Sequence, residues 1–222
     1  MSHLRSTSSR PRAVPQPTLK LGRGERTRAM ILDAALEFLW SNPFREMTVR
    51  SVMESTNLSR SAFYRHFHDL HQVMESLLLD LEQEILRGAA PWLTRPGPPL
   101  DLLHESLSGL VRVCYQRGPI LRAIVDAAPT DERLDRIWNG FLERFDVAVE
   151  SRIEEDQRQG LIREVDARSM AVALNRLDVA ELAAAFGRRP RRTSGPVFDV
   201  LFRIWSSALY GPKPQDPGAR SQ

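Results

Sequence analysis

A short stretch of small polar and basic side chains in the first third of the chain has the residue types needed to contact nucleic acid. It consists of Ser59, Arg60, Ser61, Tyr64, Arg65 and His66. A helix enters the DNA major groove with short or polar residues at its N-terminus, and the positive end of its dipole attracts phosphate. Phe63 and Phe67, four residues apart, would hold such a helix against a core and leave Tyr64 facing outward. We therefore expect residues 59–66 to form a recognition helix, with the Tyr64 hydroxyl free to bond a DNA phosphate.

The residues before this stretch predict the rest of a helix-turn-helix. Apolar residues recur at helical spacing from about Gly24 until Pro43 ends the pattern. Thr48 is suited to cap a short second helix, and Ser59 to cap the third. The turn between them contains Asn57, a residue type that tolerates the left-handed backbone conformation. One alternative stays open at this point, namely that the aromatic residues are ordinary core residues of a helical bundle.

Basic residues are concentrated in the same third of the chain. Residues 1–69 contain 11 Lys and Arg against 6 Asp and Glu, whereas residues 70–222 contain 20 against 22. This asymmetry favours a polyanionic partner such as nucleic acid. Arg23, Arg26 and Arg28, at the start of the first helix, are expected to add phosphate contacts and reach toward the minor groove.

The remainder of the chain predicts an all-α protein with about nine helices, because apolar residues recur at spacings of three and four and no convincing strand is found. We expect a disordered basic arm, a helix-turn-helix DNA-binding domain, a ligand-binding and dimerisation domain and a loose tail. Their predicted bounds are residues 1–20, 21–70, 71–211 and 212–222 respectively.

Several helix ends in the second domain are predicted from Pro, Gly and capping residues. Thr130 is expected to cap the longest helix and Gly160 to end it, while Pro196 is expected at the first position of the last helix. Residues 91–99, rich in Pro, predict a hinge loop. The Gly118-Pro119 pair predicts a break between two helices.

The motif from Thr48 to Val73 resembles the TetR family of transcriptional regulators. Thr48, Ser59, the Phe63-Tyr64 pair and Phe67 stand where the family pattern has its Thr, its turn Ser and its aromatic residues. The resemblance implies a dimeric regulator that binds a palindromic DNA operator, with Thr48 and Tyr64 as phosphate ligands.

The sequence departs from that family pattern at two positions. Asn57 replaces the usual Gly of the turn, a substitution that the backbone can absorb, and Leu70 replaces a usual Lys. His68 or His71 is available for the phosphate contact that the Lys would make.

Three later segments resemble the mycobacterial ethionamide repressor EthR within that family. They are IWNGFLERF (137–145), ALNRLDVAELAAAFG (173–187) and FRIWSSALYG (202–211). The resemblance implies a hydrophobic tunnel for a small amphiphilic effector, lined by Trp138, Phe141, Phe145, Asn175 and Trp205. Asp178 stands where that relative has a second Asn.

The residues themselves leave two interpretations of this region open. Large aromatic residues facing helices rich in Ala can leave a cavity, in which an amide or carboxyl group would orient a ligand. The alternative is a fully packed core with Asn175 and Asp178 facing solvent. The last two helices also carry apolar residues beyond one stripe, which predicts a homodimer through these helices.

Other signals are weaker or exclude whole classes of protein. His66, His68 and His71 straddle a helix end, so we expect contact with DNA or solvent rather than a metal site. The single Cys114 excludes an internal disulfide and is expected to be buried and inert. The basic run 188–192 is expected to be a solvated loop, since it joins the last two helices far along the chain from the helix-turn-helix.

The same sequence predicts no membrane contact and a cytoplasmic location, because no apolar run has the length of a membrane span or of a signal peptide. No Gly-rich phosphate loop, catalytic triad or zinc motif is found, so we expect neither a cofactor nor enzymatic activity. The competing interpretation is an all-helical enzyme or lipid-binding adaptor that uses the apolar cavity.

Overall fold

The computed structural model describes residues 22–211, and within them the protein is all-α, as predicted. Eight α-helices and two short 3-10 helices follow one another without a strand in that range, which agrees with the expected helix count. The elements are α1 Arg23–Ser41, η1 Phe44–Glu46, α2 Val49–Glu54, α3 Arg60–Tyr64, α4 Leu70–Thr94, α5 Pro99–Ala127, η2 Ala128–Thr130, α6 Glu132–Arg158, α7 Ala167–Phe186 and α8 Ser194–Tyr210. The predictions for residues 1–20 and 212–222 lie outside the described residues. No helix in the described part of the chain is long and apolar enough to cross a membrane.

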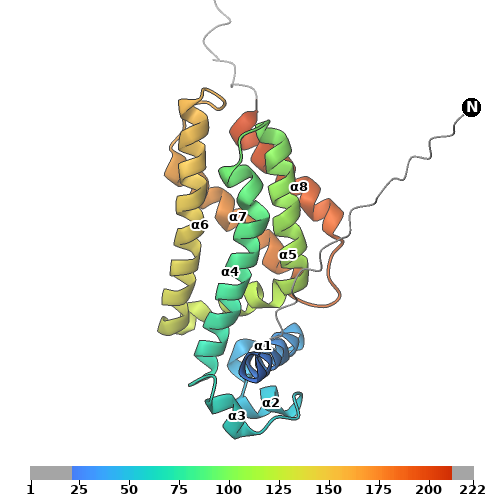
Figure 1. The fold of residues 1–222 in the computed structure, drawn as a ribbon. Coiled ribbons are helices and arrows are strands. Elements are labelled where there is room, and N and C mark those ends of the chain that lie inside the picture. The colour runs from blue at the N-terminus through green and yellow to red at the C-terminus, as the bar shows by residue number, and fades with distance from the viewer. Residues whose placement is uncertain (1–21, 212–222) are drawn as a thin grey trace, which may run out of the picture.

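The helices form a small group at one end of the molecule and a larger bundle at the other (Figure 1). Helices α1, α2 and α3 make up the small group, which we call the headpiece. Helix α4 runs from the headpiece into the bundle, where it lies alongside α5 and α6, and α7 and α8 pack behind them. We call the bundle of α4 to α8 the body.

Local hydrogen bonds explain the helix starts that the sequence predicts in and beside the headpiece. The Thr48 hydroxyl accepts from the Ser51 amide at 3.0 Å, and the Ser59 hydroxyl accepts from the Ala62 amide at 3.3 Å. Asp69 caps α4 in the same way, accepting from the Gln72 amide at 2.8 Å. Asn57 has a positive φ of 55°, so the left-handed turn expected at this residue is confirmed.

The predicted hinge loop at 91–99 is wrong, because α4 continues through Pro91 to Thr94. A proline inside a helix normally disrupts its hydrogen bonds. Here Ser106 of α5 repairs the disruption: its hydroxyl accepts from the Trp92 amide at 2.8 Å and donates to the Ala89 carbonyl at 2.9 Å. The connection between α4 and α5 is therefore short.

The predicted break at Gly118-Pro119 is also wrong, since α5 is one continuous helix. Gly118 instead allows α5 and α7 to cross closely. A Cβ atom placed on Gly118 would lie 2.3 Å from the carbonyl oxygen of Phe186 at the end of α7. The sequence thus marks a close packing contact at this point rather than a helix end.

Two other helix starts differ slightly from expectation, whereas Gly160 does end α6 as predicted. Asp131 rather than Thr130 caps α6, accepting from the amides of Arg133 and Leu134 at 3.0 Å. Pro196 lies in the first turn of α8 but not at its first position, which is compatible with the helix because amides of that turn have no intrahelical partner. Gly160 has a φ of 70°, a left-handed conformation that terminates α6.

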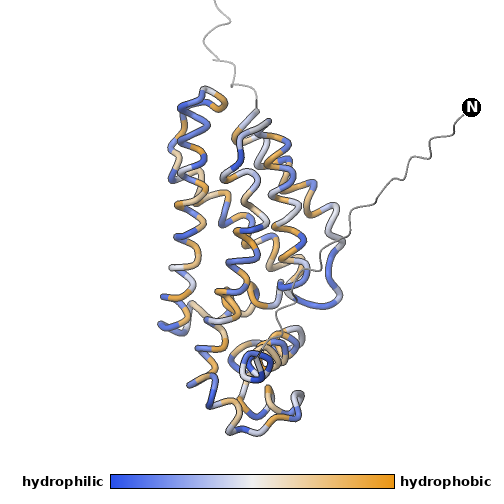
Figure 2. The backbone as a smooth tube through the Cα atoms, in the orientation of Figure 1, coloured by the Kyte–Doolittle hydropathy of each residue, from blue (hydrophilic) through white to orange (hydrophobic). Residues whose placement is uncertain are grey.

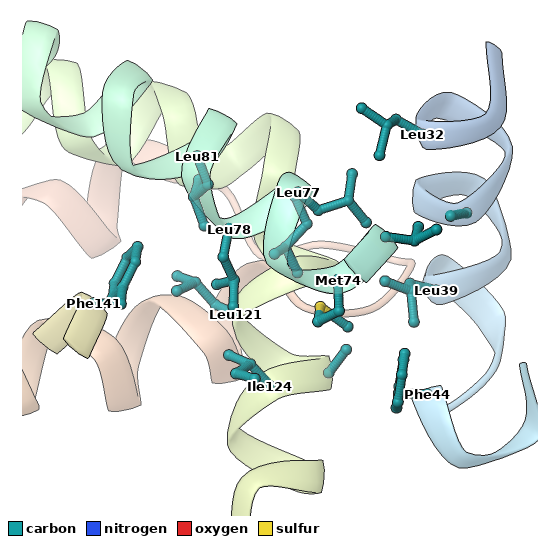
Figure 3. Packing of buried hydrophobic residues seen from close by; sticks show 14 of the residues in the cluster. Leu32, Leu39, Phe44, Met74, Leu77, Leu78, Leu81, Leu121, Ile124 and Phe141 are labelled. Atoms are coloured by element: carbon teal, nitrogen blue, oxygen red, sulfur yellow. The ribbon is translucent and has the colours of Figure 1, made fainter. Parts of the chain in front are cut away.

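One hydrophobic cluster joins the headpiece to the body. Figure 3 shows Leu39 of α1 and Phe44 facing Met74 and Leu77 of α4, with Leu121 of α5 beyond them. Helices alternate between hydrophobic and hydrophilic residues along their length (Figure 2), and the hydrophobic ones supply this cluster. A second cluster occupies the far end of the body and includes Trp92, Leu103, Ile153, Leu174, Trp205 and Leu209. The headpiece therefore shares a core with the body and is not an independently packed unit.

We predict that Gly118→Ala lowers the free energy of unfolding by about 1–3 kcal/mol, because the added methyl group overlaps backbone atoms of α7. Gly140→Ala is the matched control, since its nearest neighbour is the flexible guanidinium of Arg144 at 3.4 Å and Ala favours a helix by up to about 1 kcal/mol. Urea unfolding followed by circular dichroism measures both. Equal stability of the two variants would contradict the close crossing.

Candidate DNA interface and ligand cavity

Helix α3 presents a polar face on an anchored aromatic base. Phe63 is fully buried and Phe67 is 2% exposed, whereas Tyr64 between them is 49% exposed. Figure 1 places α3 at the outer end of the headpiece. The predicted outward orientation of Tyr64 is therefore confirmed, and the interpretation of all three aromatic residues as core residues is wrong.

The remaining predicted residues of this segment are accessible. Ser59, Arg60, Ser61 and Arg65 are exposed, and His66 is half-buried. The Arg60 guanidinium lies 5.7 Å from the Tyr64 ring centroid and donates to its hydroxyl at 3.3 Å. This contact holds a positive charge and a hydroxyl group side by side on the exposed face, an arrangement suited to phosphate.

The other candidate DNA-binding residues lie on α1 and at the start of α2. Arg23 and Arg26 are exposed in the first turns of α1, while Arg28 is half-buried with its guanidinium 5.4 Å from the Phe67 ring centroid. The start of α1 lies near α3, since a Cβ on Gly24 would be 3.7 Å from the His66 ring. Thr48 is exposed, and its amide and hydroxyl both bond the Ser51 side chain within the capping box.

The histidines after α3 are dispersed. The His71 ring nitrogen lies 2.6 Å from a carboxylate oxygen of Asp131 in the body, so His71 is paired within the protein. His68 is exposed, whereas His71 is half-buried, so the phosphate contact stays a prediction for His68. Among the described residues, no group of His, Cys, Asp or Glu side chains is arranged to hold a metal ion.

The basic run 188–192 is mostly exposed, as expected of a solvated loop, and it also contacts the headpiece. Arg189 forms an ion pair with Glu37 of α1 at 2.8 Å, and its guanidinium lies 4.5 Å from the Trp40 ring centroid. Arg191 lies 5.2 Å from the same ring and 3.9 Å from the ring of Tyr115. The loop between α7 and α8 therefore covers the C-terminal end of α1, a long-range contact that sequence separation could not indicate.

A buried arginine beside this loop fastens the headpiece to the body. Arg122 of α5 donates to the carbonyl oxygens of Leu39 and Asn42 at the end of α1, the latter at 3.1 Å. It also donates to the carbonyl of Gly187 at the end of α7 at 3.0 Å. We call this set of three bonds the Arg122 clamp. The sequence analysis missed it, because one arginine in a long helix carries no distinguishing pattern.

The body encloses an apolar cavity of about 80 Å³. Its walls come from all five helices, α4 to α8. Phe141, Phe145, Asn175, Asp178 and Trp205 line it, as expected from the sequence. Trp138 does not: it is buried and stacks on Phe141, with ring centroids 5.1 Å apart, outside the cavity wall. Residues that the sequence analysis did not single out also line it, among them Ser106, Leu107 and Leu182.

The two polar side chains expected in the cavity wall are buried, so their alternative placement toward solvent is wrong. Asp178 accepts from the indole nitrogen of Trp205 at 3.0 Å, and burial raises the pKa of its carboxyl to about 7. Asn175 donates from its amide nitrogen to Asp146 at 2.8 Å. Arg176 binds both carboxylate oxygens of Asp146, at 3.1 and 2.9 Å, which fixes the acceptor for Asn175.

A second polar network closes the far end of the body and was also missed. The Trp92 indole donates to the Tyr210 hydroxyl at 2.8 Å, which in turn donates to Asp156 at 2.5 Å. Arg152 and Asp156 form a buried ion pair at 2.9 Å. These bonds link α4, α6 and α8, and the Trp92 ring packs edge-on against Trp205 at 5.6 Å, next to the cavity.

Two solved structures and one curated protein illustrate what this chain resembles. A TetR-family transcriptional regulator from Syntrophomonas wolfei superimposes with a TM-score of 0.72 and 14% identity, covering 84% of this chain and 96% of its own. AibR, solved with isovaleryl coenzyme A and operator DNA, has a TM-score of 0.61 and 13% identity over 84% of this chain and 99% of its own. The nucleoid occlusion factor SlmA of Marinobacter nauticus is 26% identical over 60% of this chain and 70% of its own length.

Two family models match the chain itself. The model of bacterial regulatory proteins of the tetR family matches residues 31–76, which include the helix-turn-helix. The model of the C-terminal domain of the transcriptional regulator EthR matches residues 103–211, which include most of the body. Together they account for more than half of the sequence: the first covers most of the headpiece and the start of α4, and the second covers most of the body. The chain belongs to the TetR family of transcriptional regulators and has a C-terminal domain of the EthR type.

Proposed function

We propose that this regulator is a repressor that binds a palindromic operator as a homodimer and is released by a small hydrophobic or amphiphilic effector. The headpiece, assigned to residues 21–70, would contact DNA, and residues 71–211 would bind the effector and the second subunit. We place its activity in the cytoplasm. The observation that carries the proposal is the exposed polar face of α3 above the buried Phe63 and Phe67.

The DNA contacts are assigned to α3 and to the residues that flank it in space. Ser59, Arg60 and Ser61 lie at the start of α3, where they can reach base edges, and Tyr64 and Arg65 follow on the exposed face. The phosphate contacts are assigned to Arg23, Arg26, Arg28, Thr48, Tyr64 and His66. Because these contacts release counterions, operator affinity should fall steeply with salt.

The outer faces of α7 and α8 support the assignment of the dimer interface. Ala173, Ala180 and Ala184 are exposed along one side of α7, where small side chains permit close approach of another helix. On α8, Val200 is 48% exposed and Ile204 is half-buried. A second copy of these two helices would cover this apolar surface in a four-helix bundle, which holds two headpieces at a fixed spacing.

The position of the cavity supports control by an effector. Helix α4 lines the cavity with Ile85 and begins directly beside α3, so a shift of α4 would move the headpiece. The effector can change DNA affinity only by the difference between its affinities for the two arrangements. AibR, a neighbour in fold, has been crystallised with both a small molecule and operator DNA.

We predict that Arg60→Ala weakens binding to operator DNA about 10- to 100-fold, since it removes a base or phosphate contact. Tyr64→Phe should weaken binding about 2- to 10-fold through loss of one hydroxyl. Fluorescence anisotropy with the DNA upstream of the protein's own gene measures both. Arg158→Ala is the matched control, because this exposed arginine is the last residue of α6, and Figure 1 shows that the end of α6 that leads to α7 is far from α3. Wild-type affinity in both α3 variants would refute the proposed interface.

We further predict that Arg122→Met lowers the free energy of unfolding by about 2–4 kcal/mol, because carbonyl groups at two helix ends lose their buried donor. Amide exchange in α1 should also become faster, since the clamp fixes the end of that helix. Arg136→Met, at an exposed position on α6, is the control and should change neither quantity appreciably. Unaltered exchange in α1 of the Arg122 variant would show that the clamp does not hold the headpiece.

A further inference from the structure

The polar groups of the cavity wall are largely committed to partners within the protein. The Ser106 hydroxyl both accepts from the Trp92 amide and donates to the Ala89 carbonyl. The Trp205 indole donates to Asp178, and Cys114 contributes a buried thiol. Only the polar atoms that remain can recognise the polar part of a ligand.

The remaining atom of Asn175 is a hydrogen-bond acceptor. Its amide nitrogen donates to the Asp146 carboxyl group, which also accepts two bonds from Arg176. The orientation of the amide is therefore fixed by the network behind it. The Asn175 carbonyl oxygen has no hydrogen-bond partner among residues 22–211 and is the acceptor that this residue can offer inside the cavity.

Asp178 also has an acceptor to spare. One carboxylate oxygen accepts from Trp205, and the other has no hydrogen-bond partner among residues 22–211. No Lys or Arg side chain of the described residues forms an ion pair with it, although the residue is only 6% exposed. A carboxyl group buried without a cation is costly to ionise, and burial accordingly raises its pKa to about 7.

We propose that the effector is an amphiphile whose polar end is a protonated amine, which donates hydrogen bonds to Asp178 and to the carbonyl oxygen of Asn175. Its hydrocarbon part lies among Phe141, Phe145 and Leu182 of the cavity wall. An ammonium group would be the cationic partner that the Asp178 carboxyl group lacks. It also has three N–H donors for Asp178 and the Asn175 carbonyl oxygen, which are three residues apart on α7. This assignment rests on the proposed ligand cavity and specifies the class of ligand that it takes.

Three probes of equal chain length test the proposal on the full-length protein: 1-hexylamine, 1-hexanol and hexanoate. They share one hydrocarbon chain, so differences in affinity report the polar end. Titration calorimetry at pH 7.5 should show the amine binding at least 10-fold more tightly than the alcohol, and hexanoate more weakly than both, because it places a second carboxylate beside Asp178. Equal affinity of the amine and the alcohol in the wild type overturns the proposal without any variant.

The variant Asp178→Asn removes the ionisable carboxyl group while it keeps a side chain of nearly the same size, so it tests whether the charge of Asp178 selects the amine. It keeps an acceptor for Trp205, and we expect the amine-to-alcohol ratio to fall to about 2-fold or less while alcohol binding persists. Asp80→Asn, an exposed carboxylate on α4, is the control and should retain the wild-type ratio. A ratio that survives in Asp178→Asn overturns the role of Asp178 but leaves the cavity intact. Absence of binding by all three probes would instead overturn the ligand cavity, and with it this proposal.

Discussion

A single buried guanidinium determines where the headpiece sits. Arg122 donates to carbonyl groups at the C-terminal ends of α1 and α7, where the negative ends of both helix dipoles add to the attraction. These carbonyls have no intrahelical donor and would otherwise be buried without partners. The body thus contacts the headpiece at the C-terminal end of α1, and a side chain of the body sets the orientation of that helix.

A second set of contacts lies where the headpiece joins the body, at the start of α4. Asp69, which caps α4, also binds Arg133 at 2.6 Å, and His71 pairs with Asp131 at the start of α6. Asp131 is itself the cap of α6, so one pair of aspartates begins two helices and ties them together. A displacement of the start of α4 relative to α6 would break these bonds. The same two helices also line the cavity, so the cavity and the start of α4 share structural elements.

The headpiece could be predicted from the sequence because its structure depends on local interactions. Thr48, Ser59 and Asp69 each cap a helix by bonding an amide three residues ahead, and Asn57 adopts its left-handed turn by itself. The buried Phe63 and exposed Tyr64 follow from helical spacing alone. In each case a short segment contains both the donor and the acceptor, or both the anchor and the exposed group.

The features that could not be predicted depend on partners distant in the chain. Helix α4 continues through Pro91 because Ser106 of α5 accepts from the Trp92 amide. Gly118 lies inside α5 because the backbone of α7 packs against it and leaves no room for a side chain. Trp138 satisfies the sequence pattern of a cavity residue yet packs on Phe141 outside the wall. A helical pattern identifies the inward face but does not tell which inward residues leave space unfilled.

In the cavity, partners distant in the chain determine which hydrogen-bonding groups of the wall stay free, as well as how the wall packs. Apolar packing alone would be more stable with a hydrocarbon side chain in place of Asp178, since an unpaired buried carboxyl opposes folding. Arg176, two residues before Asp178 on α7, is exposed and lies on another side of the helix, where it binds Asp146 and thereby fixes Asn175. The charge of Arg176 therefore orients the Asn175 amide, and the Asp178 carboxyl group lines the apolar cavity without a cationic partner among the described residues. The free acceptor atoms of Asp178 and Asn175 in the cavity wall lower the stability of the empty protein. A ligand that donates hydrogen bonds to both atoms would compensate for this cost.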